Sequence, residues 1–403
     1  MTTTDWKTLE RQYYMQCARR QPIVLVRGEG TRVWDEDGKT YLDFTAGWAV
    51  NNLGHAHPVL ANVIAEQAHT LLQTSNQFYN IPQLQAAQLL IEQSCCDRVF
   101  FCNSGAEANE GAIKLARKYG MQHRHGAYHI ITALNSFHGR TLTTTAATGQ
   151  PHYHTPYHPV PAGFDHVPFD DLDAIKAATT EQTVAIMLEP VQGEGGVHVP
   201  SPSYLTGVKQ WCEANGLLLI FDEIQTGIGR LGTLFGYQHF GVEPDIMSLA
   251  KGLGGGIPIG AVLAKAHAAV FEPGDHGSTF GGNALTCATA HATLKYLLDH
   301  DILAHAQQMG THLHQQLLSL RATHPCIVDV RGLGLLIATE FATPVAQEVV
   351  SACNAAGLLL NPVRPNAIRF MPPLTVTLGE IDEAINKLDT VLQDLTPAAG
   401  TQA

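Results

Sequence analysis

The stretch SYLTGVKQWCEANGLLLIFDEI, residues 203–224, combines a helical pattern with a continuous run of apolar residues. The spacing of the apolar residues in 203–216 predicts a helix, and Gly216 is the type of residue that closes one. The run that follows is apolar without alternation and ends at Asp222. Such a run indicates a strand that is covered on both faces, as in a parallel sheet.

The same alternation of helix and strand extends from about residue 85 to about residue 260. Further helices are expected at 82–94 and 104–120, and further strands at 98–104, 128–137, 183–191 and 244–252. Because near-continuous apolar strands separated by helices bury both faces of a sheet, the sequence predicts an α/β fold with a mostly parallel central sheet.

Two further units flank this region of the chain. Residues 30–44, GTRVWDEDGKTYLDF, predict a hairpin within an N-terminal arm, and the helices and strands after residue 284 predict a smaller α+β unit. The predicted boundaries are 1–45 for the arm, which is assigned to the small domain, 46–285 for the large domain and 286–403 for the C-terminal small domain.

The composition restricts the class of protein. The 403 residues are 45% hydrophobic, which fits a large core, and a net charge of −12 argues against a nucleic-acid partner. We expect no signal peptide, since residues 1–20 contain no apolar core segment, and no membrane helix, since no stretch approaches about 18 consecutive apolar residues. The eight cysteines are scattered and the 21 histidines show no metal-ligand spacing, which favours a cytoplasmic protein with reduced thiols and no metal.

Residues 102–118, CNSGAEANEGAIKLARK, place small residues where a strand gives way to a helix. Ser104, followed three residues later by Glu107, has the form of a capping box. The free N–H groups of a helix N-terminus also bind phosphate. Two interpretations therefore stay open at this position: a phosphate site, or only a well-capped helix.

Asp222 ends an apolar strand, at the edge where open parallel sheets bind ligands. A carboxylate there can pair with a protonated ring nitrogen or a metal, or it can cap a helix or form a structural ion pair. Residues 227–232 fit the dinucleotide pattern GxGxxG, but residues 222–226 separate them from the strand. A nicotinamide dehydrogenase is therefore only a weak alternative.

Lys251 lies in DIMSLAKGLGGG, residues 245–256, between an apolar run and a cluster of glycines. It could reach solvent, neutralise a buried carboxylate or hold a carbonyl group as an imine. The third role needs a neutral amine, which partial burial favours because it lowers the pKa of lysine.

Two arginines occupy unusual settings. Arg140 lies in a glycine-bearing loop after a strand, and Arg369 lies between Ile368 and Phe370 in a strand-like run. The guanidinium fork suits a substrate carboxylate, although a structural ion pair with Asp or Glu stays open for each. Together with the features above, these residues describe pyridoxal phosphate acting on amino acids and oxo acids.

Residues 217–264 resemble the signature of the subgroup III (ornithine-type) aminotransferases, and the resemblance extends from residue 30 to the final helix. The segments DFTAGWAVNNLGHAHP, SNQFYN, FCNSGAEANEGAIKLARK and SFHGRT are similar to the branch of this family that acts on acetylornithine. The resemblance implies fold type I of the pyridoxal-phosphate enzymes and a homodimer with shared active sites. It also implies transfer of the terminal amino group of N2-acetyl-L-ornithine to 2-oxoglutarate.

The resemblance implies a role for each residue of the site. Lys251 would bind the aldehyde covalently and move the proton, and Asp222 would keep the ring nitrogen protonated. The residues implied to bind the cofactor are Ser104, Gly105, Ala106, Phe137, Asp222, Glu223, Gln225, Lys251 and Thr279, the last one from the neighbouring subunit. The residues implied to bind substrate are Arg140, Glu194, Ser278 and Arg369, with Glu194 as a gate that pairs with Arg369 when the amino donor is bound.

One position departs from the pattern of this branch. Trp48 stands where a smaller aliphatic residue is expected, near the place for the distal group of the substrate. Other donors therefore stay open: succinylornithine, N-succinyl-diaminopimelate, ornithine and 4-aminobutyrate. An aminomutase and a noncatalytic binding protein with the same fold are further alternatives.

Overall fold

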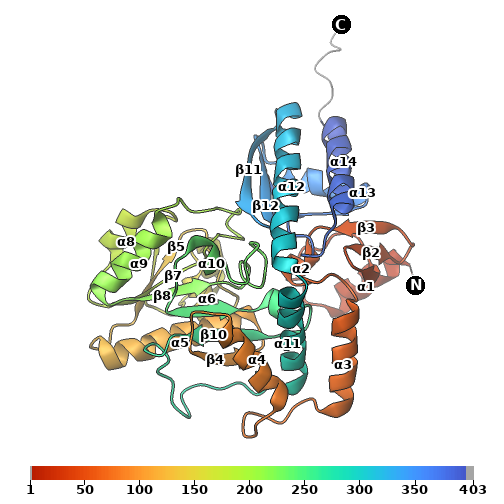
Figure 1. Cartoon of the computed structure of the whole chain (residues 1–403). Coiled ribbons are helices and arrows are strands. Elements are labelled where there is room, and N and C mark those ends of the chain that lie inside the picture. Colours follow the sequence, from red (N-terminus) through yellow and green to blue (C-terminus); the bar gives the residue numbers. More distant parts are fainter. Residues whose placement is uncertain (1, 396–403) are drawn as a thin grey trace.

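A computed structural model describes residues 2–395, and its central element is a seven-stranded sheet (Figure 1). The strand order is β4 (Arg98–Cys102), β10 (Gly260–Ala264), β9 (Ile246–Leu249), β8 (Leu218–Asp222), β7 (Thr183–Leu188), β5 (His129–Ala133) and β6 (Phe164–Val167). Only β10 runs antiparallel to its neighbours, so the mostly parallel α/β sheet expected from the sequence is confirmed.

Helices cover both faces of this sheet. They are α4 (Ile81–Glu92), α5 (Gly105–His123), α6 (Leu142–Ala147), α7 (Pro151–His154), α8 (Leu172–Ala178), α9 (Tyr204–Asn215) and α10 (Gly236–Phe240), with a 3-10 turn η1 (Thr155–Tyr157). On β8, Leu218 and Ile220 share a buried cluster with residues of α5. Leu219 and Phe221 join the opposite cluster with residues of α9. Burial on two faces explains why β8 is apolar without alternation.

Two smaller sheets lie outside the central one. The first pairs β1 (Leu25–Glu29), β2 (Arg32–Asp35) and β3 (Thr40–Asp43) with β13 (Leu358–Leu359), and the second has the order β11 (Ile327–Leu333), β12 (Leu336–Phe341), β15 (Ala367–Phe370) and β14 (Asn361–Arg364). The predicted hairpin in 30–44 is confirmed, because β2 and β3 pair antiparallel. Leu42 of β3 lies opposite Leu358, so the N-terminal hairpin adjoins the C-terminal part of the chain.

The remaining helices pack between and around these sheets (Figure 1). They are α1 (Thr3–Tyr13), α2 (Ala46–Ala49), α3 (Pro58–Thr70), η2 (Lys251–Gly254), α11 (Ala284–Asp299), α12 (Ile302–Thr323), α13 (Ala346–Ala355) and α14 (Leu378–Leu395). Within residues 2–395, no helix is both long and apolar enough to cross a membrane. The domain boundaries at residues 45 and 285 stay predictions, and residues 396–403 of the predicted C-terminal domain lie outside the described part.

Candidate active site

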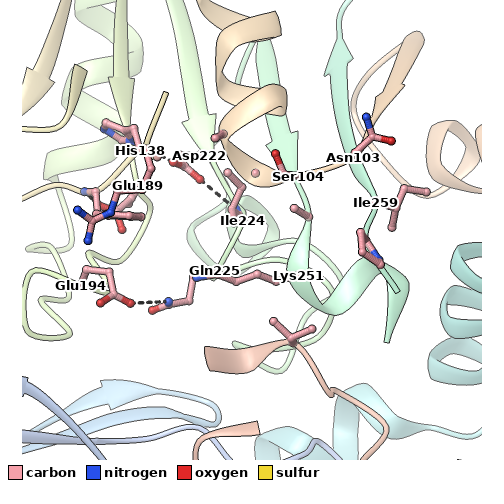
Figure 2. A pocket seen from close by; sticks show the side chains of 18 of the residues that line it. Asn103, Ser104, His138, Glu189, Glu194, Asp222, Ile224, Gln225, Lys251 and Ile259 are labelled. Atoms are coloured by element: carbon pink, nitrogen blue, oxygen red, sulfur yellow. Dashed lines mark hydrogen bonds and ion pairs between the residues drawn. The ribbon is translucent and has the colours of Figure 1, made fainter. Parts of the chain in front are cut away.

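A cavity of about 380 Å³ opens at the carboxyl ends of β7 and β8, beside the N-terminus of α5. Predicted site residues that line it are Ser104, Gly105, Ala106, Phe137, Arg140, Glu194, Asp222, Gln225 and Lys251. Figure 2 shows the side chains of Asp222, Glu194 and Lys251 gathered around one space, although they come from distant parts of the sequence. The strand ends bring them together, as expected for a parallel sheet.

Asp222 is the last residue of β8, and its carboxylate is held by three partners. Oδ2 accepts a hydrogen bond from Nδ2 of Asn109 at 2.7 Å and lies 2.8 Å from Nδ1 of His138. Oδ1 accepts from the backbone N–H of Ile224 at 3.1 Å. Only 3% of Asp222 is exposed, so these partners fix the orientation of a buried carboxylate at the cavity wall.

His138 and Asn109 contact Asp222 directly, and the sequence did not lead us to assign them to the site. Burial lowers the pKa of His138, but the hydrogen bond and charge of Asp222 outweigh burial and raise the pKa above its ordinary value. The Nδ1 proton of His138 is thus directed at Asp222. Asn109 also accepts from the Ser248 hydroxyl at 2.6 Å, which orients its amide toward the carboxylate. An Asn among buried alanines of α5 was the only sequence signal for this contact.

Lys251 starts the 3-10 turn η2, with Ala250 between it and the last residue of β9, and has a φ of +47°. Burial lowers the pKa of its ammonium, the charge of Glu194 opposes this effect, and Arg369 adds to it. The shift to a lower pKa increases the share of neutral amine, which a lysine needs in order to react with an aldehyde. The next residue in the chain is Gly252. An added Cβ at this position would lie 2.0 Å from Nδ2 of Asn52, so the close contact with Asn52 needs a glycine.

The N-terminus of α5 presents free backbone N–H groups to the cavity. Ser104 caps the helix by accepting from the N–H of Glu107 at 3.2 Å. The Glu107 carboxylate bonds to the N–H of Asn103 at 2.8 Å rather than to that of Ser104, so the predicted capping box is only half formed. The N–H groups of Gly105 and Ala106 lie in the first turn, before the helix can supply acceptors, and are suited to a phosphate.

Arg369, on β15, is fully buried and faces two site residues. Its Nη2 lies 2.8 Å from Oε1 of Glu194, and its Nη1 donates to Oε1 of Gln225 at 2.9 Å. Burial raises the pKa of Glu194, but Arg369 and Lys251 outweigh burial and lower the pKa to about 2. Glu194 is therefore ionised and paired with Arg369. We call this pairing, which the resemblance implies while the amino donor is bound, the closed gate.

Phe137 and Arg140 lie on the loop after β5. The Arg140 guanidinium carbon lies 5.3 Å from the centre of the Phe137 ring and 4.1 Å from that of Tyr153. Glu189 accepts hydrogen bonds from the N–H groups of Phe137 at 3.2 Å and Gly193 at 3.1 Å. Burial raises the pKa of Glu189 to about 7, against the opposing effect of His138. One carboxylate thus ties the Phe137 loop to the turn that leads to Glu194.

Other predicted residues lie outside the cavity. The Glu223 carboxylate accepts from the N–H groups of Gly236 and Tyr237, away from the cavity. Ser278 accepts from Asn103 at 3.0 Å, and the exposed Thr279 adjoins it. Trp48 is 59% exposed, so its ring is open to solvent in the single chain. The roles assigned to these residues stay predictions.

The arrangement fits pyridoxal phosphate. Asp222 offers a buried carboxylate that suits the ring nitrogen, and Lys251 offers an amine of lowered pKa that suits the aldehyde. The free helix N-terminus at Gly105 suits the phosphate. An added Cβ at Gly105 would lie 2.8 Å from Cδ1 of Ile224, so a larger residue here would force the Ile224 side chain to shift. The described part of the chain contains no cluster of His, Cys, Asp and Glu that could hold a metal.

Comparisons with known proteins match nearly the whole chain. Residues 13–392 match the family model "Aminotransferase class-III". The acetylornithine aminotransferase of Caldanaerobacter subterraneus subsp. tengcongensis is 51% identical over 389 residues, covering 96% of this chain and 99% of that protein. The ornithine aminotransferase from Toxoplasma gondii ME49 matches with a TM-score of 0.95 and 36% identity, covering 98% and 96%. The acetylornithine aminotransferase from Elizabethkingia anophelis matches with a TM-score of 0.88 and 34% identity, covering 98% and 100%.

Proposed function

Because the chain belongs to the class-III aminotransferases, we propose that it moves the terminal amino group of N2-acetyl-L-ornithine to 2-oxoglutarate. The products are N-acetyl-L-glutamate 5-semialdehyde and L-glutamate, which is a step of arginine biosynthesis. The observation that carries this function is the 51% identity to an acetylornithine aminotransferase over nearly the full length of both chains. The enzyme depends on pyridoxal phosphate, as its family does.

The residues of the cavity have distinct tasks. Pyridoxal phosphate, when bound, supplies an aldehyde that takes up and returns the amino group, and a ring that stabilises the charge released at the substrate carbon. Lys251 would hold the aldehyde and carry the proton at the substrate carbon. Asp222 would keep a proton on the ring nitrogen, since His138 and Asn109 hold its carboxylate in place. Gly105 and Ala106 would bind the phosphate through their N–H groups.

Further residues bind the substrates. Phe137 would pack against the ring, and Gln225 would donate to the ring hydroxyl. Arg140 has its guanidinium over two aromatic rings and takes a substrate carboxylate. Glu194 pairs with Arg369 while the amino donor is bound and leaves it for the carboxylate of 2-oxoglutarate. The ion pair at 2.8 Å supports this exchange, because a carboxylate already occupies the place that the acceptor needs.

A panel of amino donors tests the proposed donor. Acetylornithine, succinylornithine, N-succinyl-diaminopimelate, ornithine and 4-aminobutyrate are each supplied with 2-oxoglutarate, and glutamate is measured. We expect the highest kcat/KM with acetylornithine. A higher value with ornithine or 4-aminobutyrate would assign another donor. Absence of glutamate with every donor, in a protein that carries the cofactor, would favour a noncatalytic binding protein.

We also propose a homodimer in the cytoplasm. Support for the dimer comes from Phe280, which is 63% exposed beside Thr279, and from the exposed apolar side chains of Phe78 and Tyr79. All eight cysteines lie within residues 2–395 and are free thiols, which suits a reducing compartment. The molar mass in solution and the distribution between cell fractions test these two proposals.

A further inference from the structure

Arg230 is a fully buried arginine that pairs with no carboxylate among residues 2–395. Its Nη1 donates to the backbone oxygens of Leu335 at 3.1 Å and Pro372 at 2.6 Å. Its Nη2 donates to Oδ1 of Asn52 at 2.8 Å. Burial lowers the pKa of Arg230 to about 9, and the charge of Arg369 adds to this effect. An uncompensated buried charge is costly, so the structure retains this guanidinium for the contacts it makes.

Asn52 extends these contacts toward the cavity. Its Nδ2 donates to the backbone oxygen of Ile228 at 2.6 Å, and its backbone oxygen accepts from the N–H of Leu374 at 2.7 Å. Its amide also packs on Gly252, where an added Cβ would lie 2.0 Å from Nδ2. Asn52 therefore touches three backbone segments that are far apart in the sequence.

Each of these segments carries a residue of the cavity. Lys251 immediately precedes the glycine that Asn52 contacts, and Gln225 lies on the turn bonded to the Asn52 amide. Arg369 lies in the strand that leads to the proline bonded by Arg230. Arg230 and Asn52, which we call the Arg230–Asn52 pair, thus connect the three backbone segments that carry the side chains of Lys251, Gln225 and Arg369.

We propose that the Arg230–Asn52 pair positions Arg369 for the carboxylate of 2-oxoglutarate. In the closed gate, Arg369 is held directly by Glu194 at 2.8 Å, Gln225 at 2.9 Å and Asn361 at 2.8 Å. When Glu194 leaves, Gln225 and Asn361 still bond to Arg369, and its position also depends on the backbone of β15 and of the residues that follow it. Arg230 fixes that backbone through Pro372. This inference rests on the proposed function, since it needs 2-oxoglutarate to replace Glu194.

The proposal predicts a defect in one half of the reaction. The donor half proceeds with Arg369 held by Glu194, and Arg230 itself bonds to the backbone that follows Arg369 and not to the backbone of Lys251 or Gln225. Loosening the Arg230 contacts therefore changes the donor half little. The acceptor half needs Arg369 at a fixed place without Glu194, so loosening the pair weakens acceptor binding. Substitution of a residue with a purely structural role would lower the rates of both half-reactions to a similar extent.

Arg124 provides a matched control. It donates to three backbone oxygens, of Thr183 at 3.2 Å, Asn215 at 2.7 Å and Gly216 at 2.8 Å. Thr183 is the first residue of β7, so these contacts lie at the end of the sheet opposite to the cavity. Arg124→Lys therefore removes hydrogen bonds of the same kind without touching the site.

The experiment measures each half-reaction of the holoenzyme by single-turnover kinetics, with acetylornithine and with 2-oxoglutarate. For Arg230→Gln we expect the concentration of 2-oxoglutarate for half-maximal rate to rise about tenfold, and the donor half to change less than about twofold. Arg230→Lys should recover part of the effect. In the cofactor-free protein, glutarate should raise the unfolding temperature less in Arg230→Gln than in the wild type or Arg124→Lys.

Other outcomes would overturn the proposal. Equal losses in both half-reactions of Arg230→Gln, or no loss in either, would overturn the positioning role while the proposed function stands. If the wild type transfers no amino group to 2-oxoglutarate from any donor, both proposals fail together. If the Arg230 variants do not fold, Asn52→Ser decides, because it removes the side-chain acceptor of Arg230 together with the bond to Ile228 and leaves the guanidinium in place. A symmetric loss there would contradict the proposal.

Discussion

Among single side chains, Asp222 shows how burial and hydrogen bonding together set the chemistry of the site. Its carboxylate is almost inaccessible to water, yet Asn109 and His138 both approach the same oxygen, at 2.7 Å and 2.8 Å. These two donors fix the orientation of the carboxylate at the cavity wall. A buried carboxylate held in this way interacts more strongly with a proton on a ring nitrogen than one in water does.

We therefore expect Asp222→Asn to lower the rate of amino transfer by about 100-fold or more, because the amide cannot balance a protonated ring nitrogen. The rate with acetylornithine and 2-oxoglutarate measures this effect. Asp245→Asn is the control: Asp245 is also buried and accepts from the N–H of Leu219 at 2.8 Å, at the opposite end of the sheet. A similar loss of rate in both variants would show that the Asp222 effect is only structural.

The sequence predicted the site residues that stand at the ends of strands, because there the position in the chain determines the position in space. Asp222, Lys251 and the N-terminus of α5 line the same cavity for this reason. Asn109 and His138 were not assigned to the site, since their contact with Asp222 depends on how α5 and a loop pack across the sheet. Glu223 follows Asp222 directly in the sequence, but its side chain points away from the cavity, toward the first turn of α10.

Among helices and strands, the short helix α10 depends on one carboxylate. Glu223 is fully buried and bonds to the N–H groups of Gly236 and Tyr237 in the first turn. Burial raises the pKa of Glu223 to about 7, although these N–H groups oppose that shift. The folded state therefore binds a proton at Glu223 over a range of pH in which the unfolded state has released it.

From this shift we predict how stability changes with pH. Since the folded pKa of Glu223 lies at about 7 and its ordinary value is 4.5, its contribution to the free energy of unfolding falls as pH rises from about 4.5 to about 7. Glu223→Gln cannot ionise, so about 2–3 kcal/mol of that fall should disappear. Urea unfolding of both proteins at pH 5 and pH 7 measures the difference. Identical pH dependence would refute this role of Glu223.

The elements themselves were largely predictable, and one exception has a local cause. Lys251 was expected at the end of a strand, but β9 ends at Leu249 and the lysine starts a 3-10 turn. This departure depends on the positive φ of Lys251, which the pattern of apolar residues does not report.

For the molecule as a whole, exposed apolar side chains indicate a partner surface. Tyr79 is 93% exposed, and Phe78, Ile81 and Phe280 are exposed as well. Asn80 and Asn76 bond to the backbone of residues 278–282, so the segments that carry these side chains lie side by side. Thr279 belongs to this surface rather than to the cavity of its own chain, which supports a role in the cavity of a second copy.

Mixed dimers test whether the site is shared. Lys251→Ala and Thr279→Asp should each be inactive, the second because a carboxylate would repel the phosphate. In a mixed dimer, one site combines the intact Lys251 of one chain with the intact Thr279 of the other, so activity should return on co-expression. A mixture of Lys251→Ala with Asp222→Asn should stay inactive, since both residues serve the same chain's cavity. No recovery in the first mixture would contradict the shared site.

The chemistry proposed here depends above all on the amine of Lys251. Reduction of the holoenzyme with sodium borohydride fixes pyridoxal phosphate to the lysine that holds it, and mass spectrometry of peptides then identifies that residue. We predict that the added mass is found on Lys251, and that Lys251→Ala shows none after the same treatment. A label on another lysine, or no label in a protein that carries the cofactor, would contradict the assignment.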